Sequence, residues 1–163
     1  MPNQIFAEEV ECAPWLNALM LGFAVLFGAA LFFLIQEEGF SWESSSSLII
    51  GLFILLGVIN IFRTLRLSLT EEGLWFGYWK FGKQIHLVDI TRLEEQQAGF
   101  KEFYGLGIRR SVKGVWGYIN RFGTGLYLET RQGKKFFVSS NRADEWIAMI
   151  KSQQRQLVRQ RQE

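Results

Sequence analysis

Two long runs without a charged residue occupy most of the first 62 positions, and they constrain the fold more than any other feature. The first covers residues 15–35 and the second covers residues 44–62, and each contains twelve Leu, Ile, Phe or Val residues. A helix of about 21 residues is about 31 Å long, enough to cross the hydrocarbon core of a bilayer. Because only residues 36–43 connect the runs, the pattern predicts a transmembrane helical hairpin.

The charge of the chain divides at the end of the second run. Residues 1–62 hold six Glu and no Lys or Arg, a formal charge of −6, whereas residues 63–163 hold all 18 basic and ten acidic residues, a formal charge of +8. Basic residues mark the cytoplasmic side of membrane spans. We therefore expect the domain after the hairpin, and the N-terminal tail 1–14, to be cytoplasmic. The alternative, a hairpin buried in a soluble core, would leave two apolar runs of this length unexplained.

Each run also carries one amide side chain near its predicted cytoplasmic end. Asn17 lies near the start of the first run and Asn60 near the end of the second. In an antiparallel hairpin these two residues reach a similar depth, which predicts an interhelical hydrogen bond between them. The alternative is that each amide binds water at the interface.

Residues 64–152 have the pattern of a small β-rich domain. Leu65, Leu67 and Leu69 alternate with polar residues, as in a half-buried strand, and further short apolar runs separated by Gly-containing turns extend to residue 139. A helical pattern follows, with Ala143, Trp146, Ile147 and Ile150 on one face. About seven antiparallel strands and a closing helix predict an α+β chain with a pleckstrin-homology-like (PH-like) barrel. A five-stranded OB-like barrel is the alternative, and residues 153–163 are expected to form a polar tail.

Several motifs of this region resemble a family of uncharacterised bacterial membrane proteins. The motifs are Tyr104-Gly-Leu-Gly-Ile-Arg-Arg110, Gly114-Val-Trp-Gly-Tyr118, Leu126–Leu128, Gly133 and Phe137. Members of that family have an N-terminal two-helix hairpin followed by a PH-like domain. The resemblance implies a multi-pass protein of the bacterial inner membrane, and it implies no reaction.

Residues with the chemistry of catalysis or metal binding are sparse. His86 is the only histidine and Cys12 the only cysteine, so no ligand set for a metal is evident. The Gly-rich segments lack the strand and helix context of a phosphate-binding loop. We therefore expect no enzyme, no cofactor, no small-molecule substrate and no nucleic-acid partner.

Two surface features point to binding instead. The aromatic segment Trp75, Phe76, Tyr78 and Trp79 is a candidate surface for a protein partner or for self-association, because alternation sends aromatic side chains to both faces of one strand. Arg109, Arg110 and Lys113 cluster at one hairpin and form a candidate surface for anionic lipid. The sequence thus predicts a membrane-anchored binding or assembly module, and the alternative function is a sensor of anionic lipid.

Overall fold

The computed structural model describes residues 4–38 and 42–160 and divides the chain into two compact units. Unit 1 joins Met1–Glu11 to Thr64–Glu163, and unit 2 is Cys12–Arg63. Unit 2 therefore lies in the chain as an insertion within unit 1.

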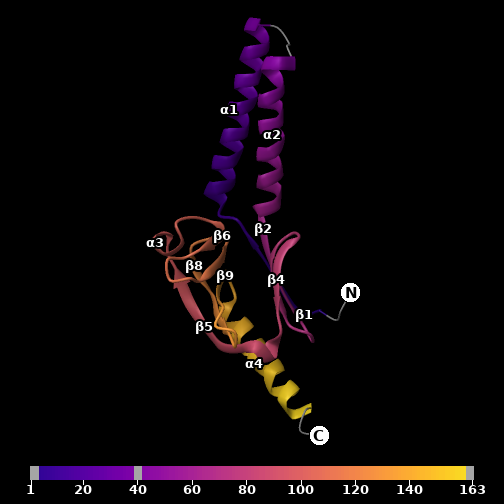
Figure 1. Cartoon of the computed structure of the whole chain (residues 1–163), viewed down its shortest axis with the longest axis vertical. Helices are drawn as coiled ribbons and strands as arrows, with labels where there is room; N and C mark the ends of the chain where they lie inside the picture. Colours follow the sequence, from indigo (N-terminus) through magenta and orange to yellow (C-terminus); the bar gives the residue numbers. More distant parts are fainter. Residues whose placement is uncertain (1–3, 39–41, 161–163) are drawn as a thin grey trace. The chain divides into compact units, whose positions relative to one another are not determined.

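Unit 2 consists of two helices, α1 (Pro14–Glu38) and α2 (Trp42–Phe62), which lie side by side (Figure 1). Helix α1 begins at Pro14, whose missing N–H costs nothing in the first turn. The backbone N–H of Cys12 donates to the carbonyl of Arg63 at 2.9 Å and so joins the two ends of the unit. The ring of Phe27 on α1 covers Gly51 on α2, where a Cβ atom would lie 3.2 Å from it.

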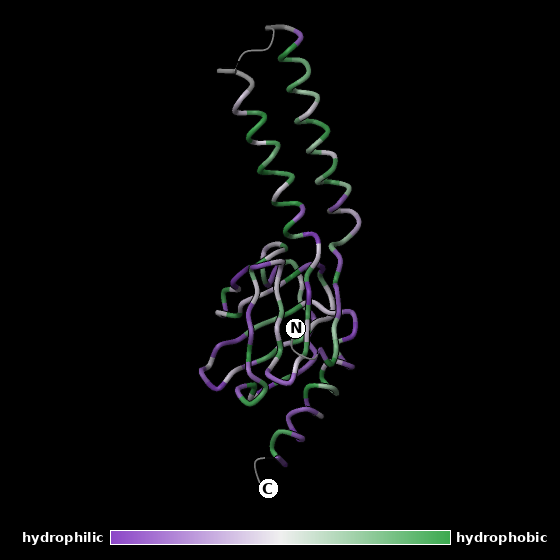
Figure 2. The backbone as a smooth tube through the Cα atoms, turned by 90° about the vertical axis from the view of Figure 1, so that its right-hand side faces the viewer, coloured by the Kyte–Doolittle hydropathy of each residue, from purple (hydrophilic) through white to green (hydrophobic). Residues whose placement is uncertain are grey.

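Within the described residues, one helix is long and apolar enough to cross a membrane, over Asn17–Gln36. The apolar part of α2, Ser46–Phe62, is shorter. At about 1.5 Å per residue it reaches about 26 Å, less than the core of about 30 Å. The prediction of two full-length spans is thus wrong: within the described residues only α1 reaches the full length, because serines occupy the first turns of α2. Figure 2 shows hydrophobic residues along the length of both helices.

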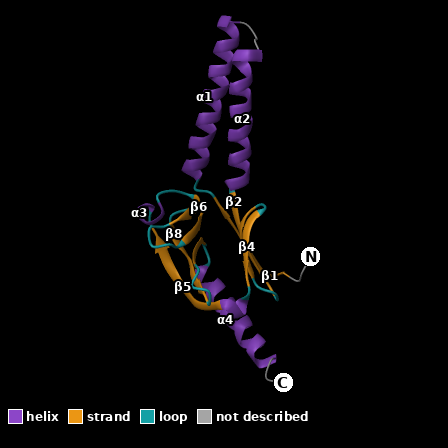
Figure 3. Ribbon diagram, viewed as in Figure 1, coloured by secondary structure: helices purple, strands orange, loops and turns teal. Residues whose placement is uncertain are grey.

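The first sheet of unit 1 has four antiparallel strands in the order β1-β2-β3-β4. Figure 3 colours the strands of unit 1 orange and the helices purple. Their bounds are β1 (Gln4–Glu11), β2 (Thr64–Thr70), β3 (Leu74–Tyr78) and β4 (Phe81–Ile85). Strand β1 lies within the predicted tail 1–14, so most of that segment belongs to the folded domain. Because Glu11 is paired with Thr64, the helices are inserted at one end of a β-hairpin. We call this end of unit 1, defined by Glu11 and Thr64, the attachment end.

The second sheet has five strands in the order β5-β8-β9-β7-β6. Its pairs are antiparallel except for β7 and β9, which are parallel. The strand bounds are β5 (Ile90–Ala98), β6 (Gly107–Arg110), β7 (Trp116–Ile119), β8 (Gly123–Thr130) and β9 (Lys135–Ser139). The helical segments of unit 1 are the short η1 (Leu87–Asp89), α3 (Phe100–Phe103) and α4 (Ala143–Gln160).

The predicted PH-like antiparallel barrel is wrong, because the nine strands of the described residues form two separate sheets and neither closes. The chain passes from one sheet to the other through η1, so β4 and β5 are not paired. The parallel contact of β7 with β9 also interrupts the predicted antiparallel order. Sequence patterns identify strands, whereas this arrangement depends on which strands pair.

The core lies between the two sheets. Phe76 on β3 makes edge-on ring contacts with Tyr118 on β7 and Phe136 on β9, at centroid distances of 4.9 and 5.7 Å. A second apolar cluster under α3 and the neighbouring loops includes Phe103, Tyr127 and Phe137. Gly117 makes this packing possible, since a Cβ atom there would lie 2.7 Å from the Phe103 ring.

Helix α4 completes unit 1 through buried apolar side chains and one polar contact. Trp146 and Ile150 are fully buried. The side-chain amide of Gln154 donates to the carbonyl of Leu87 at 2.6 Å and so joins α4 to η1. The predicted polar tail 153–163 is helical as far as Gln160, and its last three residues lie outside the described part of the chain.

We predict that unit 1 folds without unit 2 when residues 12–63 are replaced by an Asn-Gly turn between Glu11 and Thr64, since such a turn suits an antiparallel pair. A chain that begins at Thr64 lacks β1 and the fully buried Val10. Its free energy of unfolding is expected to be lower by about 3 kcal/mol or more. Urea denaturation followed by circular dichroism measures both chains, and equal stability would show that β1 is dispensable.

Candidate functional site

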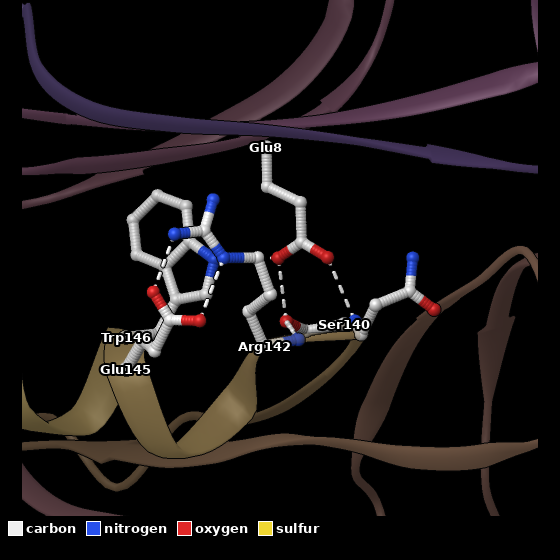
Figure 4. Close-up of polar contacts among 6 residues, drawn as sticks. Glu8, Ser140, Arg142, Glu145 and Trp146 are labelled. Atoms are coloured by element: carbon white, nitrogen blue, oxygen red, sulfur yellow. Dashed lines mark hydrogen bonds and ion pairs between the residues drawn. The ribbon is translucent and has the colours of Figure 1, made fainter.

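A buried polar cluster in unit 1 centres on Glu8 of β1, a residue that is 7% exposed (Figure 4). Its Oε2 accepts hydrogen bonds from Ser140 Oγ and Trp146 Nε1, both at 2.6 Å, and its Oε1 accepts one from the backbone N–H of Asn141 at 2.7 Å. Ser140 Oγ in turn accepts from the backbone N–H of Arg142 at 3.0 Å. The carboxylate therefore lies at the start of α4, where free backbone N–H groups favour an anion.

Phe6 and Arg142 extend this cluster toward the surface. Phe6 makes an edge-on contact with Trp146 at 4.7 Å, and the Arg142 guanidinium lies 4.6 Å from the centre of the Phe6 ring. Arg142 also donates from Nε to Glu145 at 2.9 Å. This contact raises the pKa of Arg142 and lowers the pKa of Glu145. The Glu145 pair therefore stabilises the fold above the ordinary pKa of glutamate, and its contribution is lost as the pH falls through the lowered value.

Glu8 links β1 to α4, because its carboxylate accepts hydrogen bonds from three donors in and just before α4. The sequence patterns did not lead to a prediction of this role. The available signal was alternation: Phe6, Glu8 and Val10 share one face of β1, which places a carboxylate in an otherwise apolar inward row.

Glu8→Gln is predicted to lower the free energy of unfolding by about 2 kcal/mol, because an amide NH₂ then faces donors and the charge-assisted hydrogen bonds are lost. The matched control is Glu9→Gln at the next position, where the carboxylate is 61% exposed and pairs with Arg66. The control should change stability by less than about 0.5 kcal/mol. Equal effects of the two substitutions on the free energy of unfolding in urea denaturation would refute the proposed link between β1 and α4.

The predicted aromatic partner surface is divided by the fold. Phe76 and Tyr78 are fully buried in the core, so the prediction that they belong to an exposed partner surface is wrong. Their face of β3 is the inward one, as alternation requires. Trp75 is half-buried because its ring lies over Gly82 of β4, where a Cβ atom would be 2.2 Å from it. Trp79 remains outside, with 59% of its surface exposed.

Trp79 and Lys80 form the two-residue turn between β3 and β4, because Tyr78 pairs with Phe81. Trp79 has a φ of +45°, a left-handed conformation that is unusual for a large side chain. The Lys80 ammonium lies 5.0 Å from the centre of the Trp79 ring, and Phe81 is 55% exposed. We call residues 79–81 the aromatic tip.

The predicted lipid-binding residues Arg109, Arg110 and Lys113 are all exposed, around the β6–β7 hairpin. Arg109 donates to the carbonyl of Leu106 at 3.0 Å, and the Arg110 guanidinium lies 5.7 Å from the centre of the Trp116 ring. The turn that carries Lys113 precedes β7. The residue that follows β7, Asn120, donates a hydrogen bond to the carbonyl of Val10, one residue before Glu11. The Lys113 turn therefore lies at the end of β7 remote from the attachment end.

In the described part of unit 2, no hydrogen bond joins the side chains of Asn17 and Asn60. Asn17 is half-buried and Asn60 is exposed. Their predicted pairing stays a prediction.

The remaining residues with reactive side chains, among those that the structure describes, do not lie together in one site. Burial raises the pKa of the Cys12 thiol, against a smaller opposing effect of a hydrogen bond with the Ala13 backbone. His86 is exposed, and its Nδ1 lies 3.0 Å from the carbonyl oxygen of Glu72. A hollow of about 180 Å³ beside His86 is also lined by Lys83, Asp89 and Lys134. Among the described residues, no group of three or more His, Cys, Asp or Glu is placed to hold a metal ion.

Comparisons of the chain with protein-family models, with curated proteins and with solved structures found no match. The resemblance to bacterial membrane proteins with a two-helix hairpin therefore stays a prediction from the motifs.

Proposed function

We propose that this protein is a membrane-anchored, non-catalytic module for binding or assembly. The observation that carries the proposal is the surface of α1: none of the apolar stretch over Asn17–Gln36 is buried inside the structure. Leu21 and Leu26 are each 67% exposed. Such a surface is unfavourable in water and favourable in a bilayer.

In this proposal α2 is a second span, and the protein lies in the bacterial inner membrane with both ends of the chain in the cytoplasm. The support is the exposed apolar surface of α2, where Phe53 is 72% and Ile54 62% exposed, together with the placement of all basic residues after position 62. A short span is accommodated by local thinning of the bilayer or by flanking residues that reach the interface.

The surface proposed for a protein partner or for a second copy is strand β4. It is an edge strand of the first sheet, and its residues from Phe81 to Gln84 are exposed. The opposite edge, β1, is partly covered, because the side chain of Asn120 donates to the backbone carbonyl of Val10. An open edge can add a strand from another chain. An assembly role is favoured over an enzyme by the scattered positions of the reactive side chains.

Anchoring is tested by extracting membranes with alkaline carbonate. The wild-type chain should stay in the pellet. The double substitution Leu21→Arg and Leu26→Arg should release the chain into the soluble fraction or cause its degradation, since each Arg costs about 3 kcal/mol near the centre of a span. The matched control is Leu21→Ala with Leu26→Ala, which should stay in the pellet. Release of the wild-type chain by carbonate would contradict the proposal.

The number of spans is tested by cysteine accessibility in a Cys12→Ser background. Ser41→Cys, in the connection between the helices, and Val112→Cys, in unit 1, are labelled separately with a membrane-impermeant maleimide in sealed inverted vesicles. Two spans predict that position 112 reacts at once and that position 41 reacts only after detergent is added. Reaction of both before detergent would mean that α2 does not cross.

A further inference from the structure

We propose that the aromatic tip, Trp79–Lys80–Phe81, inserts into the lipid interface of the bilayer that holds α1, and so fixes the orientation of unit 1 on the membrane. This inference rests on the proposed membrane anchoring. Its partner is the headgroup and upper acyl region of the lipids.

The strand register places the tip at the attachment end. Arg66 of β2 pairs with Gly77 of β3, and continuing this antiparallel register brings Trp79 level with Thr64 on the neighbouring strand. Neighbouring strands are about 5 Å apart. Only Arg63 lies between α2 and β2 in the chain, and only Cys12 and Ala13 lie between β1 and α1. The attachment end is therefore where the chain leaves unit 1 for the proposed spans and where it returns.

The side chains of the tip have the chemistry of an interfacial anchor. Trp79 is 59% exposed and Phe81 55% exposed, although both are large enough to contribute substantially to a core. Tryptophan prefers the membrane–water interface, where its ring is in the apolar layer and its N–H meets water or headgroups. Lys80, beside the Trp79 ring, can extend its ammonium to lipid phosphate while its methylene groups stay in the apolar layer.

The backbone of the tip shows that the turn itself does not favour tryptophan. A φ of +45° at Trp79 suits Gly or Asn, which tolerate left-handed conformations. Retaining a large aromatic side chain at a strained position is typical of a residue with a role beyond folding. This gives the proposal a useful test, because replacing Trp79 by Asn should relieve strain rather than unfold the domain.

A second exposed aromatic group lies at the same end of unit 1. Phe100 and Tyr104, on and after α3, are 60% and 65% exposed. Phe100 contacts Phe122 at 5.7 Å, and Phe122 lies two residues after Asn120, which bonds to Val10 near the attachment end. The proposed contact with lipid thus has two parts, the aromatic tip and the exposed rings of Phe100 and Tyr104.

The charges around the tip are compatible with an anionic membrane. Lys80 in the tip and Lys101 beside Phe100 are both exposed. Glu11, at the end of β1, is the exposed acidic residue of unit 1 that lies nearest to the helices in the chain. The turn at the other end of β3 carries Glu71 and Glu72, both exposed. The first sheet therefore has its basic turn at the attachment end and its acidic turn at the opposite end.

The test places an environment-sensitive fluorophore on single cysteines of the full-length chain, in a Cys12→Ser background. The protein is reconstituted in vesicles of phosphatidylcholine and phosphatidylglycerol. Lys80→Cys carries the label at the tip, and Val112→Cys, where the native side chain is 89% exposed, carries the control label on the remote turn. Nitroxide groups at the headgroup or the upper acyl chain quench only labels that reach the interface. We expect strong quenching at position 80 and none at position 112.

A second set of variants shows whether the aromatic side chains cause this contact. Trp79→Asn with Phe81→Asn should reduce the ratio of docked to undocked molecules about tenfold or more, because two large apolar groups no longer leave water. The melting temperature of this variant should equal or exceed that of the labelled chain without the two substitutions. Trp116→Asn is the matched aromatic control, since Trp116 is exposed on β7 near the remote turn, and it should leave the quenching at position 80 unchanged.

The proposal is overturned if the label at position 80 stays accessible to water in a chain that resists carbonate extraction. In that case the anchoring stands and the interfacial contact fails. The label at position 80 could also be shielded from water only at a high protein-to-lipid ratio, without quenching by nitroxide lipids. This result would assign the tip to a contact between copies of the chain and would also overturn the proposal. Release of the chain by carbonate would instead refute the proposed anchoring.

Discussion

The pairing of β1 with β2 is the constraint on which the rest of the structure depends. These strands are separated in the sequence by the whole of unit 2, yet they pair along their length from Glu11 and Thr64 onward. The long connection is compensated within unit 2, where the Cys12 N–H bonds to the Arg63 carbonyl and brings the two ends together. Once they are close, closing the strand pair costs little additional chain entropy. The hydrogen bond between Cys12 and Arg63 thus favours the pairing of β1 with β2.

Strand β1 also connects the first sheet to the last helix. Its inward row places Val10 in the core and Glu8 at the start of α4, so the N-terminal strand helps to fix a helix more than 130 residues later in the chain. Removing β1 would expose the β2 edge and leave the N–H of Trp146 without its carboxylate partner. Residues 4–11 are therefore an integral part of the fold of unit 1.

Unit 1 differs between its two ends, and this difference bears on its role. The attachment end carries exposed aromatic side chains with lysines beside them, among them Trp79 and Phe100. The remote end of the first sheet carries the acidic turn of Glu71 and Glu72. Interfacial contact at one end would hold the exposed β4 edge at a constant orientation relative to the bilayer. A module that works by assembly benefits from this, since fixing orientation lowers the entropy lost on binding a membrane partner.

The sequence by itself determined the local features of this protein. The apolar run over residues 15–35 predicts α1 because length and hydropathy suffice to identify a candidate span, and alternation predicts the buried face of Leu65, Leu67 and Leu69, which the structure confirms. The pattern of Ala143, Trp146 and Ile150 likewise predicts the buried face of α4. Only the tertiary structure decided that the strands form two open sheets, that residues 4–11 pair with β2, and that Glu8 meets Trp146. These features depend on contacts between residues far apart in the chain, and periodicity along a sequence carries no information about which distant strands pair.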